Sequence, residues 1–483
     1  MHRHQRPLLL VSCAFALVTV VPAHPQSPLA DLIRENAPVI AITHVSVIDG
    51  TGAPAEADQT VLLRDGKIDS VVSSAGAQIP PNAKVIDGSG KTLIPGLVGM
   101  HEHLFYTAPT MRMNLFIEQP SSAPQLYLAS GVTTARTAGS MEPFADLYVK
   151  HQVDAGLLAG PKFHLTGPYL DGTPSSFPQM HGLSGPDEAR EFVRYWHSLG
   201  FTSMKAYMGI APDELRAAIE ESHKLGIRIT GHLCSVGFIE AAEMGIDNLE
   251  HGPFVAPDSE LYSKRKPGNC GPFYRDLRKE LLSTVDPDGP QIQQLIRNLI
   301  QHHVAVTSTL AVFESGSRPP MERVEASRGY DLMTPAQWSF IMLHRAYDIS
   351  SDADSQTILK KEMRFERAFV QAGGVLLAGC DPTGDGHTMA GLGDQRELEL
   401  LVEAGFSVPE AVQIFTLNGA RFLGEDQQIG SITPGKHADL VLLTGDLSKD
   451  VNSIEHPVLV FKDGIGFDSE KIYASLNGVV GLR

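Results

Sequence analysis

The chain has 483 residues, enough for two or three domains or for one large barrel with an accessory module. Hydrophobic residues make up 42% and charged residues 20%, which is ordinary globular usage and excludes a disordered chain. The formal net charge of -17 repels phosphate backbones and anionic lipids, so nucleic acids and membrane surfaces are poor candidate partners.

The N-terminal segment has the pattern of a signal peptide. Arg3 and Arg6 precede an apolar run over residues 8–21, and Ala23 offers a small residue near a cleavage point. The run is too short to span a bilayer, which needs about 20 residues. We therefore predict that residues 1–25 are removed and that the mature protein is exported, periplasmic or secreted, and does not bind a membrane.

Short β segments dominate both ends of the remaining chain. Turn residues, mostly Asp-Gly pairs, separate them. The strands expected in these regions cover residues 39–47, 60–63, 67–72, 84–87, 438–443 and 457–462. We predict one small β-sandwich domain that is assembled from residues 38–92 and 429–483.

The middle of the chain, residues 93–428, alternates apolar runs with helical patterns, which is typical of an α/β fold with a parallel sheet. Eight runs match the strands of a (β/α)8 TIM barrel. These runs cover residues 92–103, 131–136, 162–167, 203–207, 228–232, 248–251, 305–308 and 375–381. A helix is expected over residues 213–225, ending at Gly226. The excess over the usual ~250 residues falls in 254–300 and 312–359, which we expect to form lid and specificity elements.

His101 and His103 form the sharpest local motif. In a strand, residues i and i+2 point to the same side about 6.6 Å apart, so both imidazoles can reach one metal ion while Glu102 faces away. A lone pair of this kind is more often satisfied within a strand or turn. Here three later strands also end in a potential ligand, and strand ends are where barrel active sites are built. The three later ligands are His232, His251 and Asp381.

Several motifs occur together in a fixed order. The sequence PGLVGMHEH covers residues 95–103, single histidines follow at later strand ends, a late aspartate comes next, and GKHADL closes the series at residues 435–440. This ordered set resembles the amidohydrolase superfamily, in particular its imidazolonepropionase-like and Xaa-Pro-dipeptidase-like members. The resemblance covers nearly all of the mature chain and implies a metal-dependent hydrolase.

The resemblance implies a binuclear centre with two divalent metal ions, most commonly Zn²⁺. His101 and His103 would bind the first, more buried ion, and His232 and His251 the second. In binuclear members, a carboxylated lysine on the fourth strand bridges both ions, and Lys205 occupies that position. Two cations need such an anionic bridge. The alternative is a lysine at the barrel mouth that binds a substrate carboxylate.

The function implied is the cleavage of an amide or peptide C–N bond in a small-molecule substrate, such as a dipeptide or an N-acyl amino acid. A metal-bridging hydroxide would attack the carbonyl, with Asp381 as metal-site residue and general base and acid. Tyr207 and His164 are candidates for hydrogen bonding to the tetrahedral intermediate. Tyr106, Tyr207 and His387 are candidates for substrate binding, although plain packing is the commoner role for the tyrosines and His164.

Some positions depart from the family pattern. Gly99 stands where aspartate is usual, which removes one orienting hydrogen bond, and Thr137 follows Arg136 where another aspartate is frequent. Leu233 follows His232, so the second histidine found there in many relatives is absent. Cys234 and Cys380 lie beside proposed ligands and are expected to be small buried thiols.

Three alternatives remain open. The first is a mononuclear deaminase or cyclic-amide hydrolase of the imidazolone type. Such relatives often have glutamate at the position of Ser235, so the serine argues against this alternative. The second is a lactone or ester hydrolase on the same fold. The third is an exported binding protein that has lost its chemistry, which the filled metal positions disfavour. Relatives are often homo-oligomers, so the resemblance also implies self-association.

Overall fold

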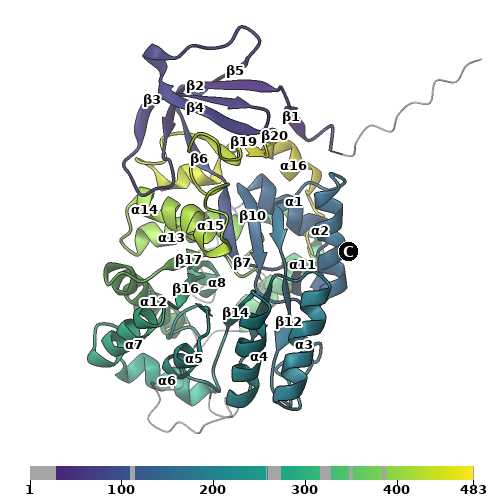
Figure 1. The fold of residues 1–483 in the computed structure, drawn as a ribbon, viewed down its shortest axis with the longest axis vertical. Coiled ribbons are helices and arrows are strands. Elements are labelled where there is room, and N and C mark those ends of the chain that lie inside the picture. The colour runs from purple at the N-terminus through teal and green to yellow at the C-terminus, as the bar shows by residue number, and fades with distance from the viewer. Residues whose placement is uncertain are drawn as a thin grey trace, which may run out of the picture.

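The computed structural model describes residues 29–108, 115–256, 258, 261, 274–315, 328–347, 352–382 and 388–481. The predicted signal segment lies outside the described residues. The remaining chain forms a β-rich domain and a larger body of parallel strands and helices (Figure 1). Strands from the N-terminus, in purple, and from the C-terminus, in yellow, lie together at one end of the molecule.

The β-rich domain contains one nine-stranded sheet. Its order is β1-β20-β19-β18-β6-β2-β3-β4, and β5 also pairs with β2. The strands are β1 (Ile33–Glu35), β2 (Val39–Val47), β3 (Glu56–Arg64), β4 (Lys67–Ser73), β5 (Lys84–Asp87), β6 (Lys91–Pro95), β18 (Leu440–Thr444), β19 (Pro457–Lys462) and β20 (Ile465–Asp468). The predicted β-sandwich would have two separate sheets, whereas these strands belong to one sheet. Strand β2 joins its parts, because it pairs with β5 through its first half and with β6 through its second half.

The two ends of the chain share the core of this domain. Strand β18 pairs antiparallel with β6, so that Leu442 lies opposite Leu93. Alternate residues of these strands point to one side and pack with Ile40, Ile42 and Phe461 in a single buried cluster. The domain is therefore complete only when both terminal segments are present.

The predicted strand at residues 92–103 is two strands in the structure. Strand β6 ends at Pro95, and β7 (Leu97–Glu102) begins in a different sheet. Proline has no N–H group to continue a ladder. Gly96 donates to the carbonyl of Asp439 in the β domain at 2.8 Å, and Leu97 donates to Gly131 of the body at 2.9 Å. A side chain at Gly96 would overlap Thr133, so the crossing point requires glycine.

The body contains the other predicted strands in two parallel sheets. One has the order β11-β10-β7, and the other runs β12-β13-β14-β15-β16-β17 in chain order. The strands are β10 (Val132–Thr137), β11 (Lys162–His164), β12 (Thr166–Leu170), β13 (Ser203–Ala206), β14 (Arg228–Gly231), β15 (Asn248–Glu250), β16 (Ala305–Ser308) and β17 (Leu376–Ala378). The predicted strand at residues 162–167 is interrupted at Leu165, giving β11 and β12. A hairpin of β8 (Phe105–Thr107) and β9 (Phe116–Glu118) follows β7.

Most of the helices lie between successive strands of the body, while α13 to α15 follow β17 and α16 follows β20. They are α1 (Ser122–Ala129), α2 (Pro143–Asp154), α3 (Pro186–Ser198), α4 (Pro212–Lys224), α5 (Phe238–Met244), α6 (Tyr274–Thr284), α7 (Pro290–Gln301), α8 (Leu310–Ser315), α10 (Gly329–Leu332), α11 (Pro335–Tyr347), α12 (Asp352–Gln371), α13 (Leu392–Glu403), α14 (Val408–Gln413), α15 (Gly419–Leu423) and α16 (Ser469–Ser475). Helix α4 confirms the helix expected over residues 213–225, and Gly226 after it has a φ of 72°. None of the described helices combines the length and apolar character needed to cross a membrane.

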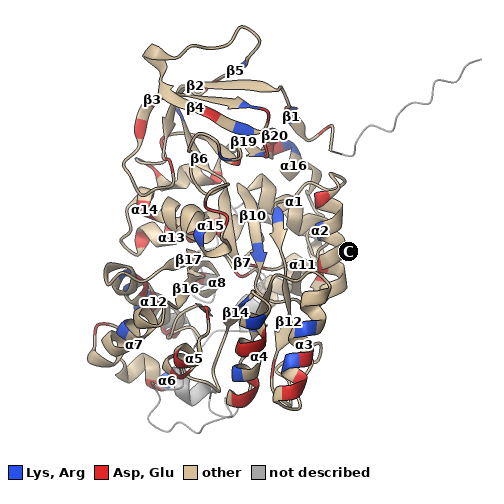
Figure 2. Ribbon diagram, in the orientation of Figure 1, with Lys and Arg blue, Asp and Glu red and all other residues tan. Residues whose placement is uncertain are grey.

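Much of the surface charge lies on helices. Figure 2 shows acidic and basic residues side by side along α3 and α4. Ion pairs join these helices, with Arg190 3.0 Å from Glu220 and Arg194 3.2 Å from Glu221. Such exposed pairs contribute little to stability, roughly 0–1 kcal/mol each.

The two long insertions of the body are largely helical where they are described. The first contains α6 and α7, and the second contains α10, α11 and the start of α12. Helix α8 immediately precedes and enters the second insertion, and two of its residues, Val312 and Phe313, line the central cavity described below.

Candidate metal centre

The predicted ligands come from the carboxyl ends of different parallel strands. His101 lies in β7 and His103 directly follows it, His232 follows β14, His251 follows β15, and Asp381 lies just beyond β17. Because the carboxyl ends of parallel strands meet at one edge, side chains far apart in sequence reach the same place.

Asp381 is the residue on which three of the histidines converge. Its Oδ1 lies 3.2 Å from Nε2 of His103 and 3.5 Å from Nε2 of His101. Its Oδ2 lies 3.8 Å from Nε2 of His251. Ligand atoms of His101, His251 and Asp381 all lie within 4.8 Å of one another, a spacing that can hold a metal ion.

His232 completes the group of histidines. Its ring centroid is 4.5 Å from that of His251, and its buried Nε2 has no hydrogen-bond partner among the described residues. Burial, with the Lys205 ammonium as the next cause, lowers the pKa of His232 to about 3. Burial also lowers the pKa of His101 to about 4. Neutral imidazoles with a free nitrogen lone pair are metal ligands, so this donor set fits a divalent ion.

Two of these residues have a strained backbone. His251 has a φ of 74° and Asp381 a φ of 49°, both in the left-handed region that side chains other than glycine rarely adopt. Such strain costs on the order of 1–3 kcal/mol per residue and is concentrated at functional sites. The strain turns both side chains toward the centre at the point where their strands end.

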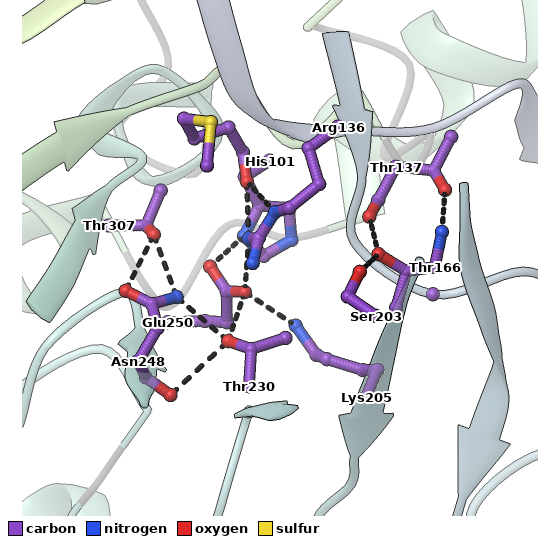
Figure 3. A network of polar contacts seen from close by, with 12 residues as sticks. His101, Arg136, Thr137, Thr166, Ser203, Lys205, Thr230, Asn248, Glu250 and Thr307 are labelled. Atoms are coloured by element: carbon purple, nitrogen blue, oxygen red, sulfur yellow. Dashed lines mark hydrogen bonds and ion pairs between the residues drawn. The ribbon is translucent and has the colours of Figure 1, made fainter. Parts of the chain in front are cut away.

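Glu250 orients His101 from behind (Figure 3). The buried carboxylate accepts hydrogen bonds from Nδ1 of His101 at 2.8 Å, from Nη2 of Arg136 at 2.7 Å and from the Thr230 hydroxyl at 2.5 Å. With its proton held on Nδ1, His101 presents Nε2 to Asp381. This is the arrangement that fixes the tautomer and the ring orientation of metal-binding histidines.

The other histidines are held in the same way. Nδ1 of His103 lies 3.2 Å from the carbonyl of Gly139, and Nδ1 of His251 lies 2.7 Å from the Thr309 hydroxyl. Each of these contacts occupies Nδ1 and leaves Nε2 facing the centre.

Lys205 lies in β13 beside this network. Its side chain is buried, and Nζ is 3.6 Å from Oε1 of Glu250. Burial, assisted by the nearby charge of Arg136, lowers the pKa of Lys205 to about 8. The neutral amine, which is the form that reacts with carbon dioxide, is therefore more abundant near neutral pH than for an ordinary lysine, at about a tenth of the molecules at pH 7.

A cavity of about 270 Å³ opens above the candidate ligands. Its described lining contains Lys205, Asp381 and all four predicted metal-binding histidines. Tyr207 also lines it, and its ring centroid lies 5.1 Å from that of His232. The structure thus brings together all six residues predicted for the metal site and one predicted catalytic tyrosine.

Three other predicted residues are placed differently. The hydroxyl of Tyr106 accepts a hydrogen bond from the backbone N–H of Ala390 at 2.8 Å, and the residue does not belong to the described cavity lining. His164 also lies outside that lining, with Nε2 3.4 Å from Glu425. Both residues thus lie outside the described cavity lining, and their catalytic and substrate-binding roles stay predictions. His387 lies outside the described residues.

The sequence reasoning missed Glu250 and the part that Arg136 plays. A signal was present, because Asn248 and Glu250 alternate along a short strand and put two polar groups on one buried face. Asn248 donates to Thr230 at 2.7 Å and to Thr307 at 2.9 Å. A buried polar face of this kind indicates a hydrogen-bond network and not a plain core.

Glu102 fills the space that an aspartate at position 99 would need. It does face away from the metal centre, but it is fully buried, and a Cβ on Gly99 would overlap its carboxylate. The thiol of Cys380 donates to Oε2 of Glu102 at 3.4 Å. The family usually has an aspartate at position 99, where this chain has glycine. The carboxyl group of Glu102 occupies the space of that aspartate side chain.

The cysteines beside the ligands do not pair with each other. Cys380 is a buried free thiol, as predicted, whereas Cys234 is disulfide-bonded, which corrects the prediction of a second free thiol. Sequence alone could not show this, because connectivity is not encoded in cysteine spacing.

Known proteins resemble this chain in sequence and in structure. Residues 340–465 match the model of the amidohydrolase family. The chain is 26% identical over 248 residues to N-acetylglucosamine-6-phosphate deacetylase of Lysinibacillus sphaericus, a match that covers 48% of this chain and 60% of that protein.

Two solved structures have a TM-score of 0.66 and 18% sequence identity. One is a Xaa-Pro dipeptidase with bound methionine, where the match covers 89% of this chain and 100% of that one. The other is a bottromycin amidohydrolase, where it covers 94% of each chain. At these identities the structural likeness concerns the fold.

Proposed function

We propose that this amidohydrolase-family chain is a metal-dependent hydrolase that cleaves an amide C–N bond in a small molecule. The observation that carries the proposal is the convergence of His101, His103 and His251 on Asp381 at 3.2–3.8 Å, with a supporting hydrogen bond behind each ring. Dipeptides and N-acyl amino acids are the first substrates to test.

A bound divalent metal ion would activate water at neutral pH and polarise the carbonyl group. Asp381 would accept the proton of the attacking water and return it to the departing nitrogen. Burial by itself would raise the pKa of Asp381, but the imidazoles around it, His101 and His103 foremost, hold it below its usual range. Asp381 is then ionised at neutral pH, as a proton acceptor must be. Tyr207, at the cavity wall beside His232, would hydrogen-bond the carbonyl oxygen.

The proposal includes carboxylation of Lys205 and a second metal ion. The lowered pKa of Lys205 and its position beside the histidines in the cavity support this part. Carboxylation would replace a buried ammonium by an anion, and Arg136 would remain as the cationic partner of Glu250.

The alternative is a mononuclear deaminase or cyclic-amide hydrolase. One observation favours it: the group of ligand atoms within 4.8 Å of one another contains His101, His251 and Asp381, enough for a single ion. Lactones and imidazolone-type rings therefore belong in the substrate panel.

The proposal also includes a closed (β/α)8 barrel. The amide of Asp381, beyond the last strand, donates to the carbonyl of His101 in the first strand at 3.0 Å. Gly379 packs directly against the backbone of His101, with no room for a side chain between them. These contacts bring β17 next to β7 and support closure.

Export is a further part of the proposal. The N-terminal charge and apolar run support it, and so does the disulfide at Cys234, because disulfides persist mainly in oxidising compartments.

The test combines metal analysis with hydrolysis assays. The protein is purified, its metal content is measured, and amides, dipeptides and lactones are screened by mass spectrometry with and without a chelator. We expect hydrolysis that the chelator abolishes and that added zinc restores. Asp381→Asn should lower kcat at least ~100-fold, whereas Asp439→Asn, at a buried aspartate of the β domain, should not. Full activity of a metal-free sample or of Asp381→Asn would overturn the proposal.

A further inference from the structure

One wall of the cavity is a continuous series of aromatic rings. The ring of His103 lies 4.6 Å from Phe105, Phe105 lies 5.1 Å from Phe116, and Phe116 lies 5.1 Å from Phe177 between centroids. The series continues from Phe177 to Tyr207 at 6.1 Å and ends at His232, 5.1 Å from Tyr207. It therefore begins and ends on the candidate metal-binding histidines.

The three phenylalanines come from three different segments, so the wall is built by tertiary contacts. Phe105 and Phe116 lie on the two strands of the β8–β9 hairpin, and Phe177 lies in the loop after β12. Gln179 fastens this loop to the hairpin: its Oε1 accepts from the amide of Phe116 at 2.6 Å, and its Nε2 donates to the carbonyl of Phe116 at 3.0 Å. The bidentate contact holds Phe116 and Phe177 edge to face, with an interplanar angle of 88°.

The rest of the described cavity lining is also mostly apolar. Met141, Tyr169, Val312 and Phe313 complete the walls around the ligand cluster. Phe177, Val312 and Phe313 are only half-buried, so a ligand can still cover their surface. An apolar group placed here would remove both its own surface and theirs from water, which favours binding.

The lining described by the structure offers little to a negatively charged group. It contains no arginine, and its lysine, Lys205, already faces Glu250 at 3.6 Å. Asp381 adds a negative charge at the centre of the site. Away from the proposed metal ions, a carboxylate lying against the aromatic wall would lose its hydration without gaining a cationic partner, which is costly.

We propose that the substrate carries an uncharged aromatic group next to the scissile bond, and that Phe116 and Phe177 are the residues that select it. This inference rests on the proposed amide hydrolysis and narrows the range of its substrates. It disfavours free dipeptides and other substrates that would place a carboxylate against this wall. Aromatic rings packed edge to face or offset against such a wall gain specific contacts beyond simple burial.

The first test is binding, which does not require turnover. Isothermal titration of the metal-loaded protein compares phenylacetamide with 4-carboxyphenylacetamide, whose ring is charged, and with acetamide, which has no ring. We expect phenylacetamide to bind at least tenfold more tightly than either. Equal binding of all three, or a preference for 4-carboxyphenylacetamide, would overturn the inference.

The second test is turnover with four matched substrates, in which glycinamide or glycine carries a phenylacetyl or an acetyl group. We expect the highest kcat/KM with phenylacetyl-glycinamide. Phe177→Ala should lower that value by about 10- to 100-fold and leave acetyl-glycinamide nearly unchanged. Phe144→Ala, at a phenylalanine of α2 that is 62% exposed and outside the described cavity lining, is the matched control.

The two failures are distinguishable. If phenylacetamide binds preferentially but no amide is hydrolysed, the proposed function fails and the aromatic subsite stands. If acetylated or carboxylate substrates are preferred, hydrolysis stands and the subsite assignment is wrong. Circular dichroism melts of both phenylalanine variants separate loss of selection from loss of folding.

Discussion

Glu250 accepts a hydrogen bond from Nδ1 of His101 at 2.8 Å in a fully buried environment. The two residues lie on strands that are far apart in sequence, and the same carboxylate also accepts hydrogen bonds from Arg136 and Thr230. The carboxylate fixes the direction in which the imidazole offers its lone pair, so metal affinity should depend on a residue that does not touch the metal.

The first prediction follows from this contact. Glu250→Gln should weaken metal binding by about 10- to 100-fold, because the amide no longer polarises or orients His101 as a carboxylate does. It should also lower stability, since Arg136 would lose its buried anionic partner at 2.7 Å. Chelator competition measures the affinity, and Glu397→Gln, an equally buried glutamate that bonds Ser308, is the matched control. Unchanged affinity in a folded Glu250→Gln protein would contradict the role given to Glu250.

The second prediction concerns Lys205. If it is a carboxylated bridge, Lys205→Ala should reduce the metal content from two ions per chain to one and abolish hydrolysis. Lys462→Ala, at a largely buried lysine of the β domain, should retain both ions. Metal analysis by plasma mass spectrometry gives the stoichiometry, and native mass spectrometry shows the added carbon dioxide. One tightly bound ion, unchanged in Lys205→Ala, would exclude the binuclear centre.

The third prediction concerns the space beside Gly99, which the Glu102 side chain fills. Gly99→Asp should destabilise the protein by about 1–3 kcal/mol, because the new side chain overlaps a buried carboxylate that cannot move away freely. The double variant Gly99→Asp with Glu102→Ala should recover part of this loss, since the second change vacates the contested space. A double-mutant cycle from thermal unfolding measures the coupling. Additive effects of the two changes would show that the two positions do not compete.

The fourth prediction is a pH dependence of stability. Burial raises the pKa of Glu397 to about 7, above its ordinary value of 4.5. The folded state therefore binds the proton of Glu397 more tightly than the unfolded state does. Ionising this side chain destabilises the folded protein, and this destabilisation is absent below pH 4.5, grows between pH 4.5 and 7, and is constant above pH 7. The destabilisation reaches about 3 kcal/mol. Relative to the native chain, Glu397→Gln should therefore gain stability between pH 5 and pH 8 in denaturant unfolding. A pH-independent difference would contradict the raised pKa.

The fifth prediction concerns processing. Protein isolated after export should begin near residue 26, and Cys380 should be alkylated only after unfolding, because it is a fully buried free thiol. Cys234 should be alkylated only after reduction, because it is disulfide-bonded. Peptide mass spectrometry after differential alkylation reads the N-terminus and both cysteines. An intact residue 1 in the exported fraction would rule out cleavage.

The strands and the residues that gather at their ends could be predicted because each depends on local patterns. Apolar runs followed by His232, His251 or Asp381 show both a strand and what stands at its end. The change of sheet at Pro95 and Gly96 was missed, although the proline was visible, because a continuous apolar run hides which sheet each half joins.

The supporting groups could not be predicted in the same way. Glu250 reaches His101 only through tertiary folding, and the aromatic wall combines Phe105, Phe116 and Phe177 from separate loops and strands. The positions of Tyr106 and His164 could not be predicted either. Each lies close in sequence to the end of a strand in the body, but sequence position does not reveal that Ala390 and Glu425 are their partners.

The pairing of β6 with β18 has a consequence for folding kinetics. Leu93 lies opposite Leu442, which is separated from it by most of the chain, so the edge of β6 that pairs with β18 has no native partner until synthesis is almost finished. Contacts of such long range form slowly, and exposed strand edges invite aggregation in the meantime. A chain whose last strands pair with the exposed edge of its first strands is suited to staying unfolded until synthesis is complete. An unfolded chain is also what passes through a translocation channel.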